Sequence, residues 1–315
     1  MRVLLAYDDS ECARTALELT CSLPWPAGSS VEVLHLLEPL PDLIGAPEVG
    51  LVSAEQADLE GDWLEAAHTA VDAAVERLRG RGHVATGRVL RGRPASVIAR
   101  EAEQRAVDLI IVGSRGHGQM DALLLGSVST ELADHAHCPV LVVRGDQIRR
   151  VIVATDGSVS AAHAIGLLVE WGILRGTEGR AVSVARSTIP VGGLAAAFEP
   201  RVAAMEAGLN QQVIASHRGI AERAAERLEE AGMRVAPDVL QGDAATEIVR
   251  AAREYGADLI VTGSRGLGTL PRLLLGSVAR KVLLHAGTSV LVMRPHPALL
   301  EERAPARGVL TAAGG

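Results

Sequence analysis

The chain has 315 residues, a net charge of −7 and 48% hydrophobic residues, which fits a folded protein of about two domains and argues against disorder. The negative charge and the absence of a basic tract argue against nucleic acid as a partner, because binding a phosphate backbone needs clustered positive charge. Three cysteines without a C-x-x-C pair, a very short apolar start and no long apolar run favour a reduced, cytoplasmic protein without a zinc site or membrane partner.

Apolar patterns predict alternating strands and helices along the whole chain. In the first half we expect them, strand first, at 2–7, 10–22, 30–37, 55–80, 84–90, 94–105, 108–113, 127–137 and 139–144. In the second half we expect them at 150–155, 159–172, 180–186, 201–231, 233–240, 245–255, 258–263, 277–286 and 289–294. The strands are nearly continuous apolar runs, typical of parallel sheets buried on both faces. We therefore predict an α/β fold of two tandem doubly wound domains.

The two halves are copies of one unit. Between 109–144 and 259–294, 19 of 36 positions are identical without a gap, which indicates duplication of a whole domain rather than a short repeat. We expect one domain at 1–146, a second at 147–297, and a flexible tail at 298–315, because the tail is rich in Pro, Ala and Gly.

One glycine pattern occurs in both copies: Gly-Ser-Arg-Gly, nine residues, then Gly-Ser-Val, beginning at Gly113 and Gly263. Such a loop between a strand and a helix can direct backbone N–H groups at a phosphate, and glycine allows positive φ or close approach of a ligand. Lys281 is the only lysine, so neither loop is a Walker A motif. The alternative is an ordinary turn in which Ser127 caps the next helix.

Asp8 and Asp156 end the first strand of each copy. Each carboxylate could bind a ribose or adenine edge, or hold a metal through water. Alternatively, or in addition, it caps the first helix, for which Ser10 and Ser158 are equally good caps. His135 and His285 also match, and their place in the last turn of a helix favours a role with the helix dipole over catalysis.

Two further segments keep the repeat spacing, at the end of the third strand of each copy. They are Gly92-Arg93-Pro94 and Gly242-Asp243-Ala244. They either wall the same site or are turn residues only.

With these motifs in order and present twice, the chain resembles the universal stress protein family over about residues 1–297. The resemblance implies that each domain is a five-stranded parallel sheet with helices on both faces. For the subgroup with this glycine motif it implies ATP as ligand, alone or with Mg²⁺. It also implies that the last strands, 139–144 and 289–294, pair the halves as a pseudo-dimer within one chain, with a homodimer of whole chains as a further option.

The resemblance implies two sets of nucleotide-binding residues and no catalytic or metal residues. The first set is Ala6, Tyr7, Asp8, Leu36, Gly113, Ser114, Arg115, Gly116, His117, Gly118, Gln119, Gly126, Ser127 and Val128. The second set is Ala154, Thr155, Asp156, Gly263, Ser264, Arg265, Gly266, Leu267, Gly268, Thr269, Gly276, Ser277 and Val278.

The second site matches the family less completely on its adenine side, so the first site ranks above the second. Ala185 and Arg186 are assigned the places of Leu36 and Leu37, and Ser289 replaces Pro139. The leading function is an ATP-binding stress or signalling protein whose conformation or protein partner depends on the nucleotide. The alternatives are a slow ATPase or nucleotide hydrolase, since no general base or lysine is placed for rapid phosphoryl transfer, and a structural dimerisation module that binds no nucleotide.

Overall fold

The computed structural model describes residues 1–38, 52–116, 125–186, 200–264 and 275–294. The first half contains β1 (Arg2–Ala6), α1 (Glu11–Ser22), β2 (Ser30–Leu37), α2 (Val52–Arg79), β3 (Val84–Arg91), α3 (Pro94–Gln104), β4 (Leu109–Gly113), α4 (Ser127–His135) and β5 (Val140–Val143). The second contains β6 (Arg150–Ala154), α5 (Val159–Trp171), β7 (Glu178–Ala185), α7 (Pro200–Glu230), β8 (Arg234–Gln241), α8 (Ala244–Tyr255), β9 (Leu259–Gly263), α9 (Ser277–His285) and β10 (Ser289–Met293). The predicted elements and their order are confirmed.

The ten strands of the described residues form one sheet, in the order β3-β2-β1-β4-β5-β10-β9-β6-β7-β8. Pairing is parallel within each half and antiparallel between β5 and β10, where Val142 lies opposite Val290. The expected doubly wound α/β halves and the pairing of their last strands are therefore present. The sheet as a whole is mixed, because the two halves meet with their strands reversed.

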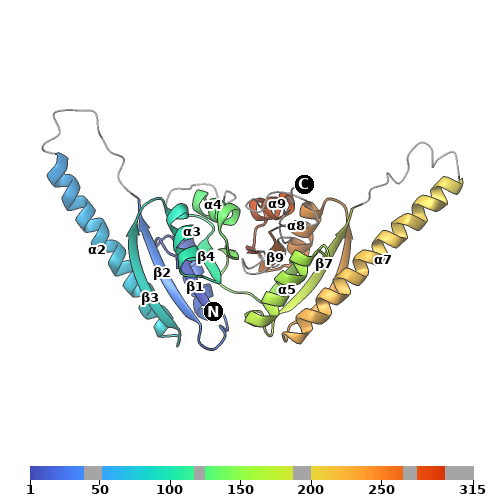
Figure 1. The fold of residues 1–315 in the computed structure, drawn as a ribbon, viewed down its shortest axis with the longest axis horizontal. Helices are drawn as coiled ribbons and strands as arrows, with labels where there is room; N and C mark the ends of the chain where they lie inside the picture. Colours follow the sequence, from blue (N-terminus) through green and yellow to red (C-terminus); the bar gives the residue numbers. More distant parts are fainter. Residues whose placement is uncertain (39–51, 117–124, 187–199, 265–274, 295–315) are drawn as a thin grey trace, which may run out of the picture.

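Helices cover both faces of this sheet. In Figure 1, α2 and α7 flank the outer strands, while α4 and α9 lie near the centre, where the halves meet. One buried cluster joins the sheet to α1, α2, α5 and α7, and a second joins its other face to α3, α4, α8 and α9. Because helices bury both faces of the sheet, residues on both sides of each strand are apolar, and the strands form continuous apolar runs in the sequence.

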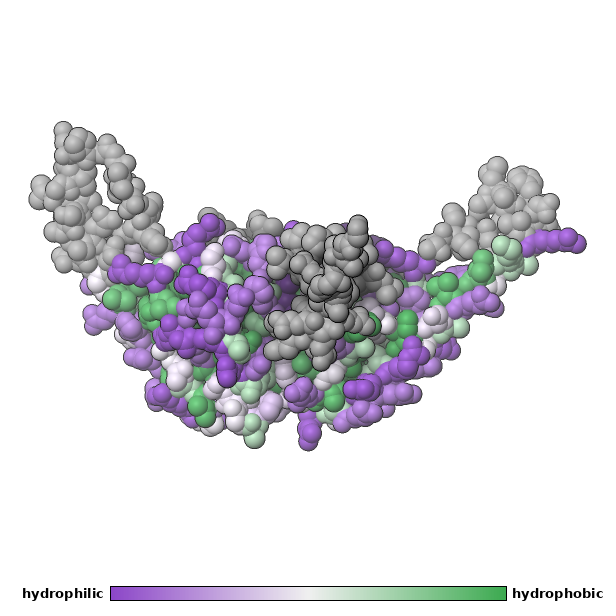
Figure 2. Space-filling view, in the orientation of Figure 1, coloured by the Kyte–Doolittle hydropathy of each residue, from purple (hydrophilic) through white to green (hydrophobic). Residues whose placement is uncertain are grey.

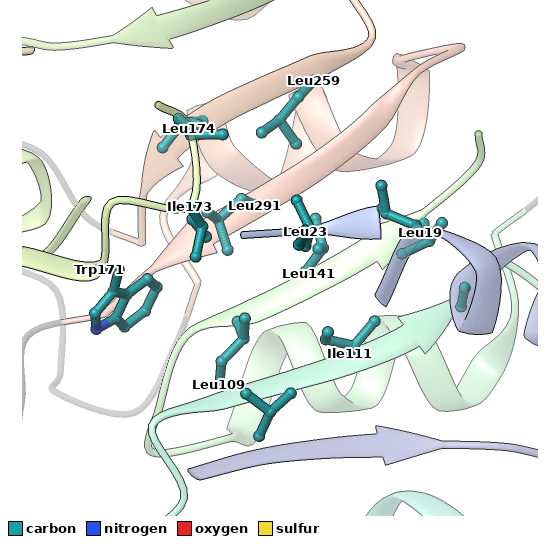
Figure 3. Close-up of a cluster of buried hydrophobic side chains, with 14 of the residues drawn as sticks. Leu19, Leu23, Leu109, Ile111, Leu141, Trp171, Ile173, Leu174, Leu259 and Leu291 are labelled. Carbon is teal, nitrogen blue, oxygen red and sulfur yellow. The ribbon is translucent and has the colours of Figure 1, made fainter. Parts of the chain in front are cut away.

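The core continues across the junction of the halves. Leu141 of β5 and Leu291 of β10 belong to one cluster with Leu109, Leu259 and Trp171, shown in Figure 3. Both junction leucines are at most 1% exposed, and burying such a side chain fully contributes about 1.5–3 kcal/mol. The contact between the halves is therefore part of the hydrophobic core.

The strand order sets where a ligand can bind. β1 lies between β2 and β4, and β6 lies between β7 and β9, so the chain reverses direction across the sheet at β1 and at β6. In doubly wound sheets ligands bind at the carboxyl ends of the strands beside such a switch point. The segments that follow β1 and β4 lie there, as do their copies after β6 and β9.

The visible surface is mostly polar, with apolar side chains in scattered patches (Figure 2). Among the exposed large apolar residues are Met205 and Leu209 on α7, and Trp63 on α2. In the part of the chain that the structure describes, no helix is long and apolar enough to cross a membrane.

Candidate functional site

Asp8 lies between the first helix and the glycine loop. Ser10 is the N-cap of α1, its hydroxyl accepting from the Ala13 N–H, so the idea that Asp8 caps this helix is wrong. Asp8 Oδ1 instead accepts from the Ser10 N–H at 3.1 Å and from the Ser10 hydroxyl at 2.6 Å. Its other oxygen, Oδ2, is directed at the loop: a Cβ built on Gly116 would lie 2.6 Å from it. The structure thus brings the predicted aspartate and glycine together.

The glycine loop is fastened at both ends to the core. The Ser114 N–H donates to the Val143 carbonyl at 2.9 Å, and the Gly126 N–H donates back to the Ser114 carbonyl at 2.8 Å. The second half repeats both bonds, from Ser264 to Met293 and from Gly276 to Ser264. The two parts of each glycine motif are therefore adjacent in space.

The described glycines of the first glycine motif are required for space and not for positive φ. A Cβ on Gly113 would lie 2.8 Å from the backbone of Cys12, and one on Gly126 would lie 3.2 Å from the Ser114 carbonyl oxygen. Neither glycine nor Gly116 has φ in the left-handed region. Gly113 therefore serves the packing of β4 on α1, whereas Gly116 borders the candidate site.

The N-cap of helix α4 is Gly126, not Ser127. Gly126 is the N-cap and Ser127 the first helical residue, as Gly276 and Ser277 are for α9, so the expectation that Ser127 caps the helix is wrong. The reason is the bond from Gly126 to Ser114, which fixes Gly126 in the capping position. Ser129, which sequence reasoning missed, donates to the Gly113 carbonyl at 2.7 Å; its counterpart in α9 is Ala279.

An apolar wall adjoins the polar groups of Asp8 and the glycine loop. Leu36, Leu90 and Val128 are partly buried and pack against the core on the α3 and α4 side of the sheet, next to Ala6. Sequence reasoning named Leu36 and Val128 but missed Leu90, which lies opposite Leu36 in the β2–β3 pairing.

The sheet register corrects the assignment in the second half. Ala6 pairs with Leu34 and Ala154 pairs with Val182, so Leu36 corresponds to Val184 rather than to Ala185. Val184 packs on the core with Leu240, Ala154 and Val278, which gives the second site an apolar wall of the same kind. Arg186 lies beyond the end of β7 and has no place in it.

The polar groups of the second site follow the same plan with small changes. Asp156 Oδ1 accepts from the Ser158 N–H at 3.0 Å, and Ser158 is the N-cap of α5. Thr155 stands where the first half has Tyr7, and its hydroxyl accepts from the Gly157 N–H at 3.3 Å. Ser264 is buried.

Some predicted residues lie outside the described part of the chain. They are His117, Gly118, Gln119, Arg265, Gly266, Leu267, Gly268 and Thr269.

Three further expectations concern residues around the sites. Gly92 and Gly242 have φ of +139° and +140° and bond to the ends of β2 and β7, as turn residues do. His135 and His285 are exposed in the last turns of α4 and α9, the position that suits a helix dipole. Ser289 does not belong to the adenine side of the second site: its hydroxyl accepts from the Arg144 N–H at 3.0 Å, across the junction.

Positive charge gathers beside the first loop. Arg115 follows Ser114, and Arg144 follows the strand residue to which Ser114 is bonded. Burial, reinforced by the charge of Arg115, lowers the pKa of Arg144. The Arg144 guanidinium is itself bonded to the Leu283 and Thr288 carbonyls across the junction, so Arg115 is the arginine that belongs to the loop.

The remaining chemistry of the described residues is sparse. They contain no group of three or more His, Cys, Asp or Glu side chains that could hold a metal ion. A cavity of about 570 Å³ lies on the α2 side of Tyr7 and Asp9, lined also by Asp62, Glu65 and alanines of α2. It lies beside the candidate site and is not formed by the glycine loop.

Residues 1–144 and 147–294 each match the model of the universal stress protein family. The chain belongs to the universal stress protein family. A universal stress protein of Mycobacterium tuberculosis is 27% identical over 315 residues, covering 93% of this chain and 94% of its own. One from Thermus aquaticus is 34% identical over 148 residues, 45% of this chain and 97% of its own.

A crystal structure of a universal stress protein from Archaeoglobus fulgidus has the same fold. It aligns with a TM-score of 0.61 at 21% identity, over 93% of this chain and 98% of that chain. The tandem arrangement of two universal stress protein units therefore extends over nearly the whole chain.

Proposed function

We propose that this universal stress protein binds ATP at two sites, one in each half, and that occupancy changes its conformation or its choice of protein partner. Membership of the family supports a role in the stress response. The observation that carries the nucleotide proposal is the position of the two glycine motifs, in which Gly126 and Gly276 are the N-caps of helices at the switch point of each half. The family also includes a protein solved in complex with cAMP.

The start of α4 suits the phosphates. The first N–H groups of a helix have no partner within the helix, and its dipole favours an anion there. At α4 these groups belong to Ser127, Val128 and Ser129. Arg115 adds positive charge beside them. Together, the start of α4 and Arg115 would hold a polyphosphate without a lysine.

The other side of the candidate site, formed by Asp8 and the apolar wall, suits a nucleoside. Asp8 is held by Ser10 and is half-buried, so its carboxylate would accept hydrogen bonds from ribose hydroxyls. Leu36, Leu90 and Val128 form an apolar wall that would pack against the flat face of adenine. Val184, Leu240 and Val278 would do the same in the second half.

The site holds a nucleotide better than it would hydrolyse one. Asp8 is a single carboxylate, which would bind Mg²⁺ through water rather than build a metal centre. Among the described residues no histidine or lysine stands beside the loop as a base or electrophile. We therefore propose binding with at most slow ATPase activity, with the slow hydrolase and the nucleotide-free dimerisation module as competing functions. A cytoplasmic location, domains at 1–146 and 147–297, and a homodimer remain predictions.

The nucleotide proposal is tested by denaturing the purified protein and identifying nucleotide in the supernatant, then titrating ATP with and without Mg²⁺ by calorimetry. We expect up to two ATP per chain. Accumulation of ADP over hours would support hydrolysis instead. A protein that carries no nucleotide and gives no heat with ATP would overturn both.

A pair of matched variants assigns the loop. Gly116→Ala puts a methyl group against Asp8 and should remove binding at the first site. Gly61→Ala is the control, because a Cβ there meets nothing within 4 Å. Equal affinities in the two variants would show that the loop does not hold the ligand.

A further inference from the structure

Two arginines cross the junction between the halves in the same way. Arg144 follows β5, and its Nη2 donates to the Leu283 carbonyl at 2.9 Å while Nη1 donates to the Thr288 carbonyl at 3.2 Å. Arg294 follows β10, and its guanidinium donates to the Ala133 carbonyl. Donors and acceptors both keep the repeat spacing of 150, so the arrangement is reciprocal.

The acceptors are the C-terminal carbonyls of the two phosphate-site helices. Leu283 lies in the last turn of α9 and Ala133 in the last turn of α4. Carbonyls in this turn lack a partner within the helix, and a cation there stabilises the helix through its dipole. Each helix thus has the proposed phosphate position at its N-terminus and an arginine from the opposite half at its C-terminus.

Each arginine is also connected to the glycine loop of its own half. The Ser114 N–H bonds to Val143, the residue before Arg144, and the Ser264 N–H bonds to Met293, the residue before Arg294. The loop of one site, the end of its last strand and the helix of the other site therefore form a continuous chain of contacts. Figure 1 shows α4 and α9 side by side at this junction, joined also by Arg280 and Asp134 at 2.5 Å.

We propose that each arginine is a positioning residue for the nucleotide site of the opposite half: Arg294 supports the first site through α4, and Arg144 supports the second site through α9. This inference rests on the proposed function, because it takes phosphate at the N-termini of these helices as given. A phosphate and an arginine at opposite ends of one helix stabilise the same alignment of peptide dipoles. Neither half alone then has a complete site.

The experiment measures each site separately. Ser277→Asp changes an exposed first helical residue, where a negative charge suits the helix dipole but opposes phosphate, leaving the first site to be titrated with ATP; Ser127→Asp does the reverse. In the Ser277→Asp background we expect Arg294→Gln to weaken ATP binding about threefold to thirtyfold, and Arg144→Gln to change it less. In the Ser127→Asp background the order of the two arginine variants should reverse.

A second measurement does not depend on nucleotide. Hydrogen exchange without ligand should become faster in 127–135 for Arg294→Gln and in 277–285 for Arg144→Gln, because each helix loses its C-terminal partner. Arg→Lys at each position retains the cation and should restore part of the protection and affinity. Arg149→Gln, an exposed arginine near the junction, is the charge-matched control.

The outcomes separate the two proposals. Wild-type protein that binds no ATP overturns the proposed function. Wild-type protein that binds ATP, with each arginine variant weakening the site of its own half or neither site, overturns this inference and leaves the proposed function standing. The crosswise pattern in affinity and exchange supports it.

Discussion

The two halves keep one backbone plan for the candidate site and differ mainly beside it. Both fasten the loop to the last strand, begin the next helix at a glycine and hold an aspartate by the N-cap serine. The apolar walls are also alike once the register pairs Leu36 with Val184. The ranking of the first site above the second therefore loses the residue assignment on which it rested.

The clearest difference between the two sites is the residue that follows Asp8 in the first half and Asp156 in the second. Asp9 has φ of 60°, which is uncommon for a residue with a side chain, whereas the second half has Gly157 there with φ of 74°. Asp9 is held by Tyr7 and by Arg14, both of its oxygens being used. In the second half Ile220 of α7 packs over Gly157 instead. The surroundings of Asp9 are thus polar, and those of Gly157 are apolar.

The largest expected effect tests whether the halves share one core. Leu141→Ala and Leu291→Ala each remove a side chain at the junction, and each should lower the free energy of unfolding by about 2–5 kcal/mol. Because the two residues lie in one cluster, denaturant unfolding should remain a single transition for wild type and variants. Two separate transitions, with each variant shifting only one, would show that the halves fold independently.

A smaller effect should come from Gly113→Ala. The new methyl group would meet the α1 backbone at Cys12, and such overpacking costs about 1–3 kcal/mol. Thermal unfolding should show the loss without ligand, whereas Gly116→Ala should leave the unfolding temperature nearly unchanged and affect ATP binding. Equal unfolding temperatures would show that Gly113 serves the ligand rather than packing.

The ion pair between the halves has no counterpart by repeat symmetry. Arg280 pairs with buried Asp134, while the positions that correspond to them are Thr130 and Leu284. Arg280→Ala leaves a buried carboxylate without its cation, and we expect a loss of about 1 kcal/mol, since Arg280 is half-exposed. Arg100→Ala, which removes an exposed arginine of α3, is the control. Equal urea midpoints for the two variants would contradict this role.

The smallest expected effect concerns Cys138, which corresponds to Thr288. Burial raises the pKa of the Cys138 thiol to about 12, so it stays protonated at pH 8 and is a poor nucleophile. Iodoacetamide should therefore label Cys138 only after unfolding, as peptide mass spectrometry would show. Labelling of the folded protein at pH 8 would contradict this.

The sequence was sufficient for the order of elements, the fold and the tandem family membership, because buried parallel strands leave continuous apolar runs and the repeat doubles every signal. It was not sufficient to identify Val184 as the counterpart of Leu36. The two-residue difference in length between the halves falls after β7 and before β8, as the pairings of Ala6, Ala154, Ser30 and Glu178 show. The sequence comparison placed part of that difference before this position of β7, and so assigned Ala185 instead of Val184 to the place of Leu36.

Features that depend on tertiary contacts were also missed. Serine is a favoured N-cap, so Ser127 was preferred over Gly126, but the bond to the Ser114 carbonyl decides the position. Ser129 carries no local signal, since its partner is the carbonyl of Gly113. The arginines at 144 and 294 repeat in the sequence, but only the antiparallel junction shows that each reaches the other half.

The antiparallel pairing of β5 with β10 also determines what the chain presents to other molecules. Cut apart, each half would expose its last strand as an open edge, ready to pair with any copy of either half. In the intact chain residues 144–149 join β5 to the first strand of the second half, and a short tether between the halves gives an effective concentration in the mM range. Each edge therefore finds its partner within the same molecule, which protects the chain from linking end to end with its neighbours.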